Sequence, residues 1–121
     1  MRYLVISDIH ANLEALEAVI AAAPSCDHVL MLGDLVGYGT NPDAVIDRVQ
    51  SLGGVTWIRG NHDKVALGLN QADGFHAAAR AAATWMLDSL TPDNRQWLVE
   101  LPKGPVVVAD GLEICHGAPF D

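Results

Sequence analysis

Short apolar runs alternate along this chain with segments of helical periodicity, and this alternation limits its fold more than any other feature. Residues 3–6, 28–32 and 55–58 are compact apolar runs of the length expected for buried strands. Residues 11–23 and 42–52 lie between them and place apolar side chains at helical spacing. The order strand, helix, strand, helix, strand predicts right-handed crossovers and a mainly parallel sheet flanked by helices, an α/β fold. We expect the first run to form the central strand.

The remainder of the chain adds helices and then changes topology. Residues 74–90 form an alanine-rich amphipathic stretch, and Thr91-Pro92 is a good start for a shorter helix that runs to about residue 101. Asp110-Gly111 separates two apolar runs and predicts a C-terminal hairpin. With 121 residues, half of them apolar, the chain is long enough for one compact domain, so we treat residues 1–121 as a single domain.

Charge and hydropathy exclude several classes of protein. The formal net charge is −8 and only seven Lys and Arg residues are scattered along the chain, which argues against an extended nucleic-acid surface. No apolar stretch reaches a membrane-spanning length, and the N-terminus lacks the pattern of a secretory signal. We therefore expect a cytoplasmic protein without membrane contact. Two cysteines are too few for a disulfide framework.

Polar motifs follow the apolar runs, each at the point where a strand is expected to end. These motifs are Asp8-Ile9-His10, Gly33-Asp34, Gly60-Asn61-His62-Asp63 and His116-Gly117. Because ligands of open α/β sheets bind beyond the carboxyl ends of parallel strands, we expect the motif side chains to gather at one edge of the sheet. Carboxylates, a carboxamide and imidazoles are the ligands that a pair of divalent metal ions needs.

The residue types suggest how two metal ions would be divided among the motifs. Asp8 and His10 can reach the same ion if the backbone departs from a flat strand between them. Asp34 has two carboxylate oxygens and is the best candidate to bridge both ions, while Asn61 and His116 are assigned to the second ion. Two such ions clamp phosphate oxygens and convert a bridging water into a hydroxide nucleophile near neutral pH.

His62 is the one motif histidine that we do not assign to metal. We expect it to act as the general acid that protonates the leaving alkoxide, with Asp63 orienting its ring. Positioned proton transfer of this kind typically contributes about 10²–10⁴-fold to a rate.

Each of these residue types also has an ordinary structural use. Asp34 after Gly33 can belong to a simple turn, Asn61 and Asp63 can cap a helix, and His116 can be a packing residue. We favour the functional interpretation because all the motifs follow predicted strands.

Other residues near the motifs receive structural predictions. We expect the Gly37-Tyr38-Gly39 segment to be a flexible turn that enters the second helix, although it could shape a substrate pocket. Arg59 could contact phosphate or point elsewhere, and we expect His28 and His76 to be surface residues.

Taken in order, the motifs resemble those of the calcineurin-like metallophosphoesterase family, in particular its small bacterial members, over essentially the whole chain. The resemblance implies the αββα layered fold, a dinuclear metal centre bridged by Asp34, and hydrolysis of a phosphomonoester or phosphodiester substrate. It also implies His62 as the catalytic acid. The family uses manganese, iron, nickel, cobalt or zinc, and we expect manganese here.

One family element is missing from this sequence. Family members carry a late Gly-His-x-His motif whose histidines bind one metal each, and no such motif occurs in these 121 residues. The chain therefore looks like the N-terminal part of an incomplete domain, and we expect its activity alone to be impaired. Apolar residues of the hairpin would lack neighbouring strands, which favours self-association or a missing C-terminal segment as partner. These residues are Val106, Val108, Leu112 and Ile114.

Two interpretations of function remain open at this point. The first is a divalent-metal-dependent phosphoesterase, and the second is a catalytically incomplete module that binds metal or a phosphorylated ligand, or that scaffolds an assembly. A haloacid dehalogenase type of phosphatase would need an Asp-x-Asp pair after the first strand, and His10 occupies the position of the second Asp.

Overall fold

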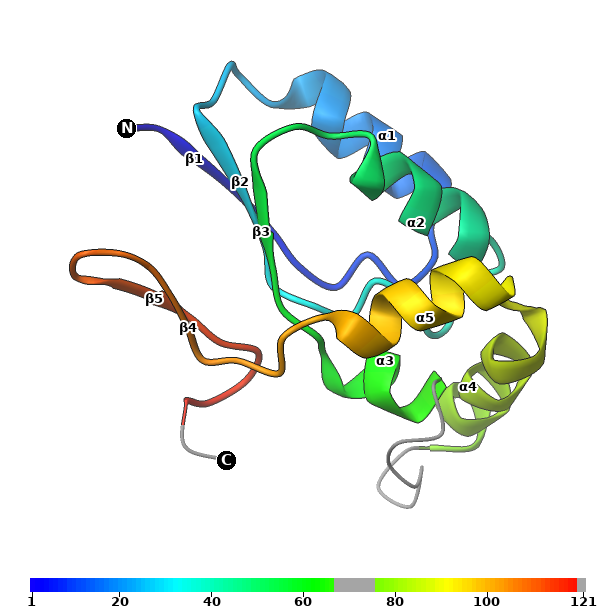
Figure 1. Ribbon diagram of the computed structural model, residues 1–121. Coiled ribbons are helices and arrows are strands. Elements are labelled where there is room, and N and C mark those ends of the chain that lie inside the picture. The colour runs from blue at the N-terminus through cyan, green and yellow to red at the C-terminus, as the bar shows by residue number, and fades with distance from the viewer. Residues whose placement is uncertain (67–75, 120–121) are drawn as a thin grey trace.

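A parallel sheet of three strands forms the middle of the computed structural model, which describes residues 1–66 and 76–119. The strands are β1 (Tyr3–Ile6), β2 (His28–Met31) and β3 (Val55–Trp57), and their order in the sheet is β1-β2-β3 (Figure 1). The predicted parallel α/β arrangement is thus confirmed. The predicted position of the first strand is wrong, because β2 pairs with both other strands and lies in the centre.

Two crossover helices and a third helix cover one face of this sheet. Helices α1 (Leu13–Ala22) and α2 (Pro42–Gln50) connect the strands, and α5 (Pro92–Glu100) lies beside α2 (Figure 1). The largest cluster of buried apolar side chains fills the space between the sheet and these helices. Its fully buried members include Met31, Leu35, Ile46, Met86 and Leu98.

Side-chain caps fix where the helices begin. The carboxamide of Asn12 accepts a hydrogen bond from the backbone N–H of Ala15 (3.0 Å), and the Thr91 hydroxyl accepts one from Asn94 N–H (3.3 Å). Both caps satisfy backbone donors that have no partner inside the helix. The predicted helix start at Thr91-Pro92 is therefore confirmed.

Two further helices extend from the end of β3. Helix α4 (Ala77–Ser89) agrees with the predicted alanine-rich helix, whose first residues lie outside the described ranges. Helix α3 (Asn61–Ala66) was not predicted and begins inside the Gly60-Asn61-His62-Asp63 motif. Gly60 of the motif therefore lies just before this helix, and the other three residues lie in its first turn.

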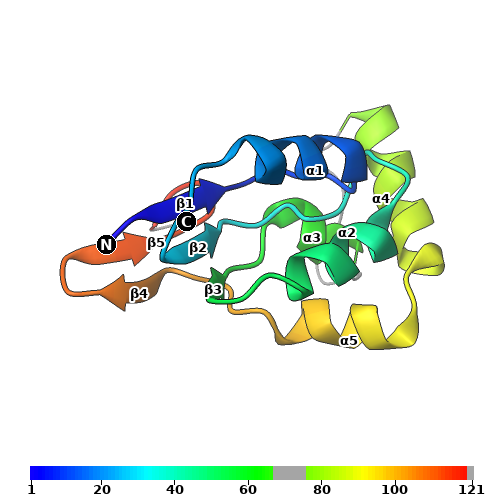
Figure 2. The same cartoon turned by 90° about the horizontal axis from the view of Figure 1, so that it is seen from above.

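An antiparallel hairpin covers the opposite face of the sheet. Its strands β4 (Val106–Ala109) and β5 (Leu112–Ile114) pair as predicted, and the view from above shows the hairpin extending away from the end of the molecule that carries α4 (Figure 2). Ile114 is buried against Leu30 and Ile58, with the other inward-facing hairpin residues packed around them. Among the described residues β4 and β5 pair only with each other, so the hairpin lacks neighbouring strands as expected, although its inner face packs on the first sheet. Self-association stays a prediction.

Membrane insertion has no structural candidate in the described ranges, where every helix is too short or too polar to cross a bilayer.

Candidate metal centre

The loops that follow β1, β2 and β3 touch through their backbones. Asp8 N–H donates to the Gly33 carbonyl (3.0 Å), and His10 N–H donates to the Asp34 carbonyl (2.9 Å). A Cβ atom built on Gly33 would lie 2.6 Å from the backbone nitrogen of Gly60, so only glycine permits this approach. The predicted convergence of the motifs at one edge of the sheet is therefore present in the backbone itself.

The backbone turns sharply at the motif residues. Asp8, His10 and Asp34 have φ angles of 59°, 51° and 56°, in the left-handed region that residues with a Cβ seldom adopt. Such conformations cost on the order of 1–3 kcal/mol each and cluster at functional sites. These angles are the departure from a flat strand that allows Asp8 and His10 to approach each other.

Carboxylate and imidazole groups from the segments after β1, β2, β3 and β5 form two overlapping groups of metal-ligand type. One group contains His10, Asp34 and His62, the other contains Asp8, Asp34 and His116, and the ligand atoms within each group lie within 4.8 Å of one another. Asp34 belongs to both groups, and only 3% of its side chain is exposed. The arrangement brings together the predicted residues and adds His62, which we had not expected among the metal-ligand groups.

Hydrogen bonds to backbone carbonyls orient two of the histidines. Nδ1 of His116 lies 2.7 Å from the carbonyl oxygen of Leu32, and Nδ1 of His10 lies 3.3 Å from that of Val36. A carbonyl oxygen can only accept, so each Nδ1 carries a proton, and Nε2 is the nitrogen left to bind a metal.

Both Nε2 atoms face carboxylate oxygens. The Nε2 of His116 is 3.4 Å from Oδ2 of Asp34, and the Nε2 of His10 is 3.4 Å from Oδ1 of Asp8 and 3.7 Å from Oδ2 of Asp34. Lone pairs that converge in this way repel one another unless a cation lies between them. The donor set therefore fits divalent metal, and oxygen with imidazole nitrogen suits manganese, iron or zinc.

Asn61 lies next to this donor set. With its amide nitrogen directed inward, it donates to Nε2 of His116 (3.0 Å) and to Oδ2 of Asp34 (3.3 Å). Half a turn about the last side-chain torsion exchanges the amide nitrogen and oxygen, and would offer the carbonyl oxygen to a cation instead.

Asp63 contacts the backbone of two loops. Its carboxylate is fully buried and accepts hydrogen bonds from the backbone N–H groups of Asp34 (2.9 Å), Val36 (3.1 Å) and Gly60 (2.9 Å). This structural role was not predicted, and the orientation of the His62 ring by Asp63 stays a prediction. Asp63 fastens the loop after β2 to the loop after β3. Burial raises its pKa to about 6, although the hydrogen bonds from Gly60 and Val36 act in the opposite direction.

His62 is largely buried beside the ligand groups. Its backbone N–H donates to Oδ1 of Asp34 (3.0 Å), and its ring packs edge-on against His10 with 4.8 Å between ring centres. Burial lowers the pKa of the His62 imidazole, and the nearby Asp34 carboxylate opposes this shift. A bound phosphate would add negative charge near the ring and so favour its protonated form.

The two aspartates that face the histidines have opposite pKa shifts. Burial raises the pKa of Asp34, against the attraction of the His116 imidazole. Burial acts to raise the pKa of Asp8 as well, but the Ser7 hydroxyl and the imidazoles of His116 and His10 outweigh it, so the pKa of Asp8 is lowered. A cation at this site would favour the ionised form of both carboxylates.

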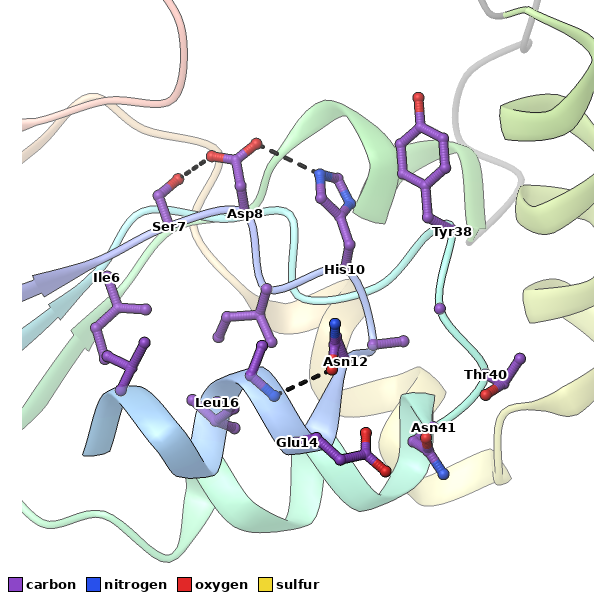
Figure 3. A pocket seen from close by; sticks show the side chains of 15 residues that line it. Ile6, Ser7, Asp8, His10, Asn12, Glu14, Leu16, Tyr38, Thr40 and Asn41 are labelled. Atoms are coloured by element: carbon purple, nitrogen blue, oxygen red, sulfur yellow. Dashed lines mark hydrogen bonds and ion pairs between the residues drawn. The ribbon is translucent and has the colours of Figure 1, made fainter. Parts of the chain in front are cut away.

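A hollow of about 610 Å³ lies beside His10 and Asp8, between the start of α1 and the loop that contains Tyr38. In Figure 3 the side chains of Asp8 and His10 point toward one another, and His10 lies between Asp8 and Tyr38. The Tyr38 ring is 5.0 Å from the rings of both His10 and His62, and its hydroxyl is 3.0 Å from Nε2 of His76. The Gly37-Tyr38-Gly39 segment is therefore part of the wall of the site, as the alternative prediction had it, and it also forms the loop that leads into α2.

The flanking glycines were the available sequence signal for this role. A Cβ on Gly37 would lie 2.8 Å from Nδ1 of His62, and a Cβ on Gly39 would lie 2.3 Å from the carbonyl oxygen of His10. Glycine on both sides of Tyr38 thus lets the segment lie directly against the histidines.

Residues 1–119 match the family model described as calcineurin-like phosphoesterase. The chain belongs to this family. Its fold is similar to that of the crystal structure of a metallophosphoesterase from Sphaerobacter thermophilus, with a TM-score of 0.73 and 40% sequence identity, covering 88% of this chain and 44% of that one. The family resemblance inferred from the motifs is therefore confirmed.

Two further proteins resemble this phosphoesterase family member. The uncharacterized protein MJ0912 of Methanocaldococcus jannaschii is 37% identical over 100 residues, which cover 81% of this chain and 41% of that protein. The crystal structure of hypothetical protein PH1004 from Pyrococcus horikoshii OT3 shares the fold, with a TM-score of 0.66 at 21% identity, covering 84% of this chain and 48% of that one. The chain thus spans a little under half the length of the relatives that it matches.

Proposed function

We propose that this chain supplies the metal centre of a divalent-metal-dependent phosphoesterase that hydrolyses a phosphomonoester or a phosphodiester. The observation that carries the proposal is the place of Asp34, a nearly buried carboxylate that belongs to both groups of potential ligands. A carboxylate with two oxygens can bridge a pair of cations, and membership of the phosphoesterase family supports a phosphoester as substrate.

We assign the metal ligands as Asp8, His10, Asp34, Asn61 and His116. When bound, two cations would neutralise phosphate oxygens and supply hydroxide from water near neutral pH. Manganese is the metal we expect, with iron, nickel, cobalt and zinc as possible substitutes. The backbone carbonyls of Leu32 and Val36 keep the histidine lone pairs directed at the centre, as hydrogen bonds to the second nitrogen of metal-binding histidines generally do.

His62 is proposed as the general acid that protonates the leaving oxygen. Its ring lies beside His10 and near Asp34, so it would be close to a phosphoester held by the metal ions. Because the nucleophile would be hydroxide, the reaction requires no covalent intermediate with the enzyme. Asp63 holds the loop geometry on which His62 and Asp34 depend, and we propose that it also orients the His62 ring.

The test separates metal binding from turnover. The chain is loaded with Mn²⁺, metal stoichiometry is measured, and hydrolysis of p-nitrophenyl phosphate and bis(p-nitrophenyl) phosphate is followed. Asp34→Asn should lose both metal and activity, whereas His62→Ala should keep the metal and lose activity by about 10²–10⁴-fold. Asp110→Asn and His28→Ala are matched controls, because Asp110 lies in the hairpin turn and His28 contacts Thr56 outside the site.

Several outcomes would contradict the proposal. Activity that survives both Asp34→Asn and His62→Ala would exclude the site as the catalytic centre. Loss of metal in His62→Ala would make His62 a ligand instead of the acid. Full metal uptake by the wild type without turnover of either ester would support a non-catalytic metal-binding module.

A further inference from the structure

A second hollow lies beside Asn61 and His116. It has a volume of about 390 Å³ and lies among the start of α3, the segment before β4 and the segment after β5. Asn61 and His116 line it, and both are also proposed metal ligands. The hollow is therefore continuous with the metal centre, and a group bound there would be next to a phosphate held by the metals.

The charge of this hollow is opposite to that of the protein. The chain carries fifteen Asp and Glu residues against seven Lys and Arg residues, for a net charge of −8. Three of the seven cations, Arg59, Lys64 and Lys103, line this hollow, and the described residues that line it include no carboxylate. We call it the cationic hollow.

Backbone contacts place these cations together although they are far apart in the sequence. The N–H of Arg59 donates to the carbonyl of Pro102 (2.8 Å), which fastens the segment before β4 against the end of β3 and brings Lys103 beside Arg59. Lys64 lies in the last turn of α3, and its N–H donates to the carbonyl of Gly60 (3.2 Å). The same short helix that carries Asn61 and His62 thus also delivers a cation to the hollow.

Arg59 has an unused donor at this place. Its Nε is buried and has no hydrogen-bond partner among the described residues, and Nη1 is 3.5 Å from the carbonyl of Val99. A buried donor of a charged group costs free energy when it lacks an acceptor. An anionic oxygen is the acceptor that a guanidinium binds best.

We propose that the cationic hollow binds a second phosphate group of the substrate. The substrates would then be small phosphoesters that carry at least one further phosphate next to the one held at the metal centre, rather than simple monophosphates. Three cations in a hollow of this size fit a compact oligophosphate, and they do not form the extended basic surface that a nucleic acid requires. The substrate class named here rests on the proposed function, but binding of phosphate at the hollow can be tested without catalysis.

The experiment measures binding of inorganic tripolyphosphate and orthophosphate to the metal-free chain by isothermal titration calorimetry. Tripolyphosphate should bind more tightly than orthophosphate, and Lys103→Gln should weaken its binding by roughly fivefold, with a larger loss for Arg59→Gln combined with Lys103→Gln. Lys103 is exposed, so Lys103→Gln tests the hollow without disturbing the core. Arg95→Gln is the matched control, because it removes an equal charge from the exposed side of α5 and should leave the affinity unchanged.

Two results would overturn the inference. One is equal binding of tripolyphosphate and orthophosphate by the wild type, and the other is an equal loss in Arg95→Gln and Lys103→Gln, which would reflect net charge alone. The two proposals fail separately. If the chain binds tripolyphosphate through Lys103 but hydrolyses no ester, the phosphate subsite is supported and the proposed function is contradicted. If the chain hydrolyses an ester but does not prefer tripolyphosphate, the proposed function is supported and the subsite is contradicted.

Discussion

Replacing Gly60 by alanine should disable the metal centre through geometry alone. A Cβ built on Gly60 would lie 2.1 Å from Oδ1 of Asp34 and 2.4 Å from its backbone nitrogen, whereas real Cβ contacts essentially never fall below 3.0 Å. Asp34 would have to retreat by about 1 Å, and it lies in a packed loop where such displacement costs about 1–3 kcal/mol of stability. The backbone of Gly60 itself permits alanine, because its φ is outside the left-handed region.

The clash displaces Asp34, the residue that both groups of ligands share. A misplacement of about 1 Å at a reacting centre can cost about 10²-fold in rate, and loss of ligand orientation typically costs about 10–100-fold in metal affinity. We therefore expect Gly60→Ala to weaken Mn²⁺ binding by at least about tenfold and to lower the rate of bis(p-nitrophenyl) phosphate hydrolysis by about 10²-fold. Mn²⁺ affinity is measured by calorimetry, and stability by urea unfolding of the metal-free protein.

Gly53→Ala is the control for the same chemical change. No atom lies within 4 Å of a Cβ at Gly53, and its φ is acceptable to alanine, so this variant should equal the wild type or gain about 0.4–1 kcal/mol. If Gly60→Ala bound Mn²⁺ as tightly as Gly53→Ala, the reasoning that Gly60 sets the position of Asp34 would be refuted.

Two further predictions concern stability. Burial raises the pKa of Asp63 to about 6, so between about pH 4 and pH 6 the folded state holds a proton that the unfolded state has released. The contribution of Asp63 to the free energy of unfolding therefore falls by about 3 kcal/mol as the pH rises through this range. Urea unfolding of the metal-free protein should therefore show a greater cost of Asp63→Asn at about pH 4.5 than at pH 7, and a pH-independent cost would contradict this pKa shift. Asn12→Ala removes the cap hydrogen bond to Ala15 and should lower stability by about 1 kcal/mol without changing Mn²⁺ affinity, whereas Asn12→Ser should retain most of the stability. Equal stability of Asn12→Ala and the wild type would show that the cap contributes nothing.

The sequence was sufficient for most of the fold because local patterns specify it. The apolar runs and helical periodicities predicted three parallel strands, four of the five helices and the hairpin turn. These patterns do not determine the order of the strands in the sheet. All three strands are apolar, and packing in the folded protein decides which of them lies in the centre. Helix α3 has six residues, too few to display an apolar period, so its sequence showed only the motif.

The predicted site residues were recognisable because their chemistry is in the side chain. Asp8, His10, Asp34 and His116 are potential metal ligands wherever they lie, and the position of each after an apolar run indicated that they would meet. The role of Tyr38 in the wall of the site was only the alternative prediction, because an aromatic residue in a turn has no motif of its own. Its role follows from contacts with His10 and His62 that depend on the folded loops.

Asp63 shows where inference from a motif stops. The motif identified a carboxylate beside His62 and suggested that it orients the imidazole ring, whereas the structure directs both of its oxygens at backbone N–H groups of neighbouring loops. Such donors cannot be read from sequence, because every residue except proline supplies the same N–H. Asp63 and Gly60 thus act on the centre through the position of Asp34, and their variants should change stability and metal affinity together. His62 has its own chemistry, so its variant should change turnover while metal affinity stays constant, and this contrast distinguishes residues that build the centre from the residue that uses it.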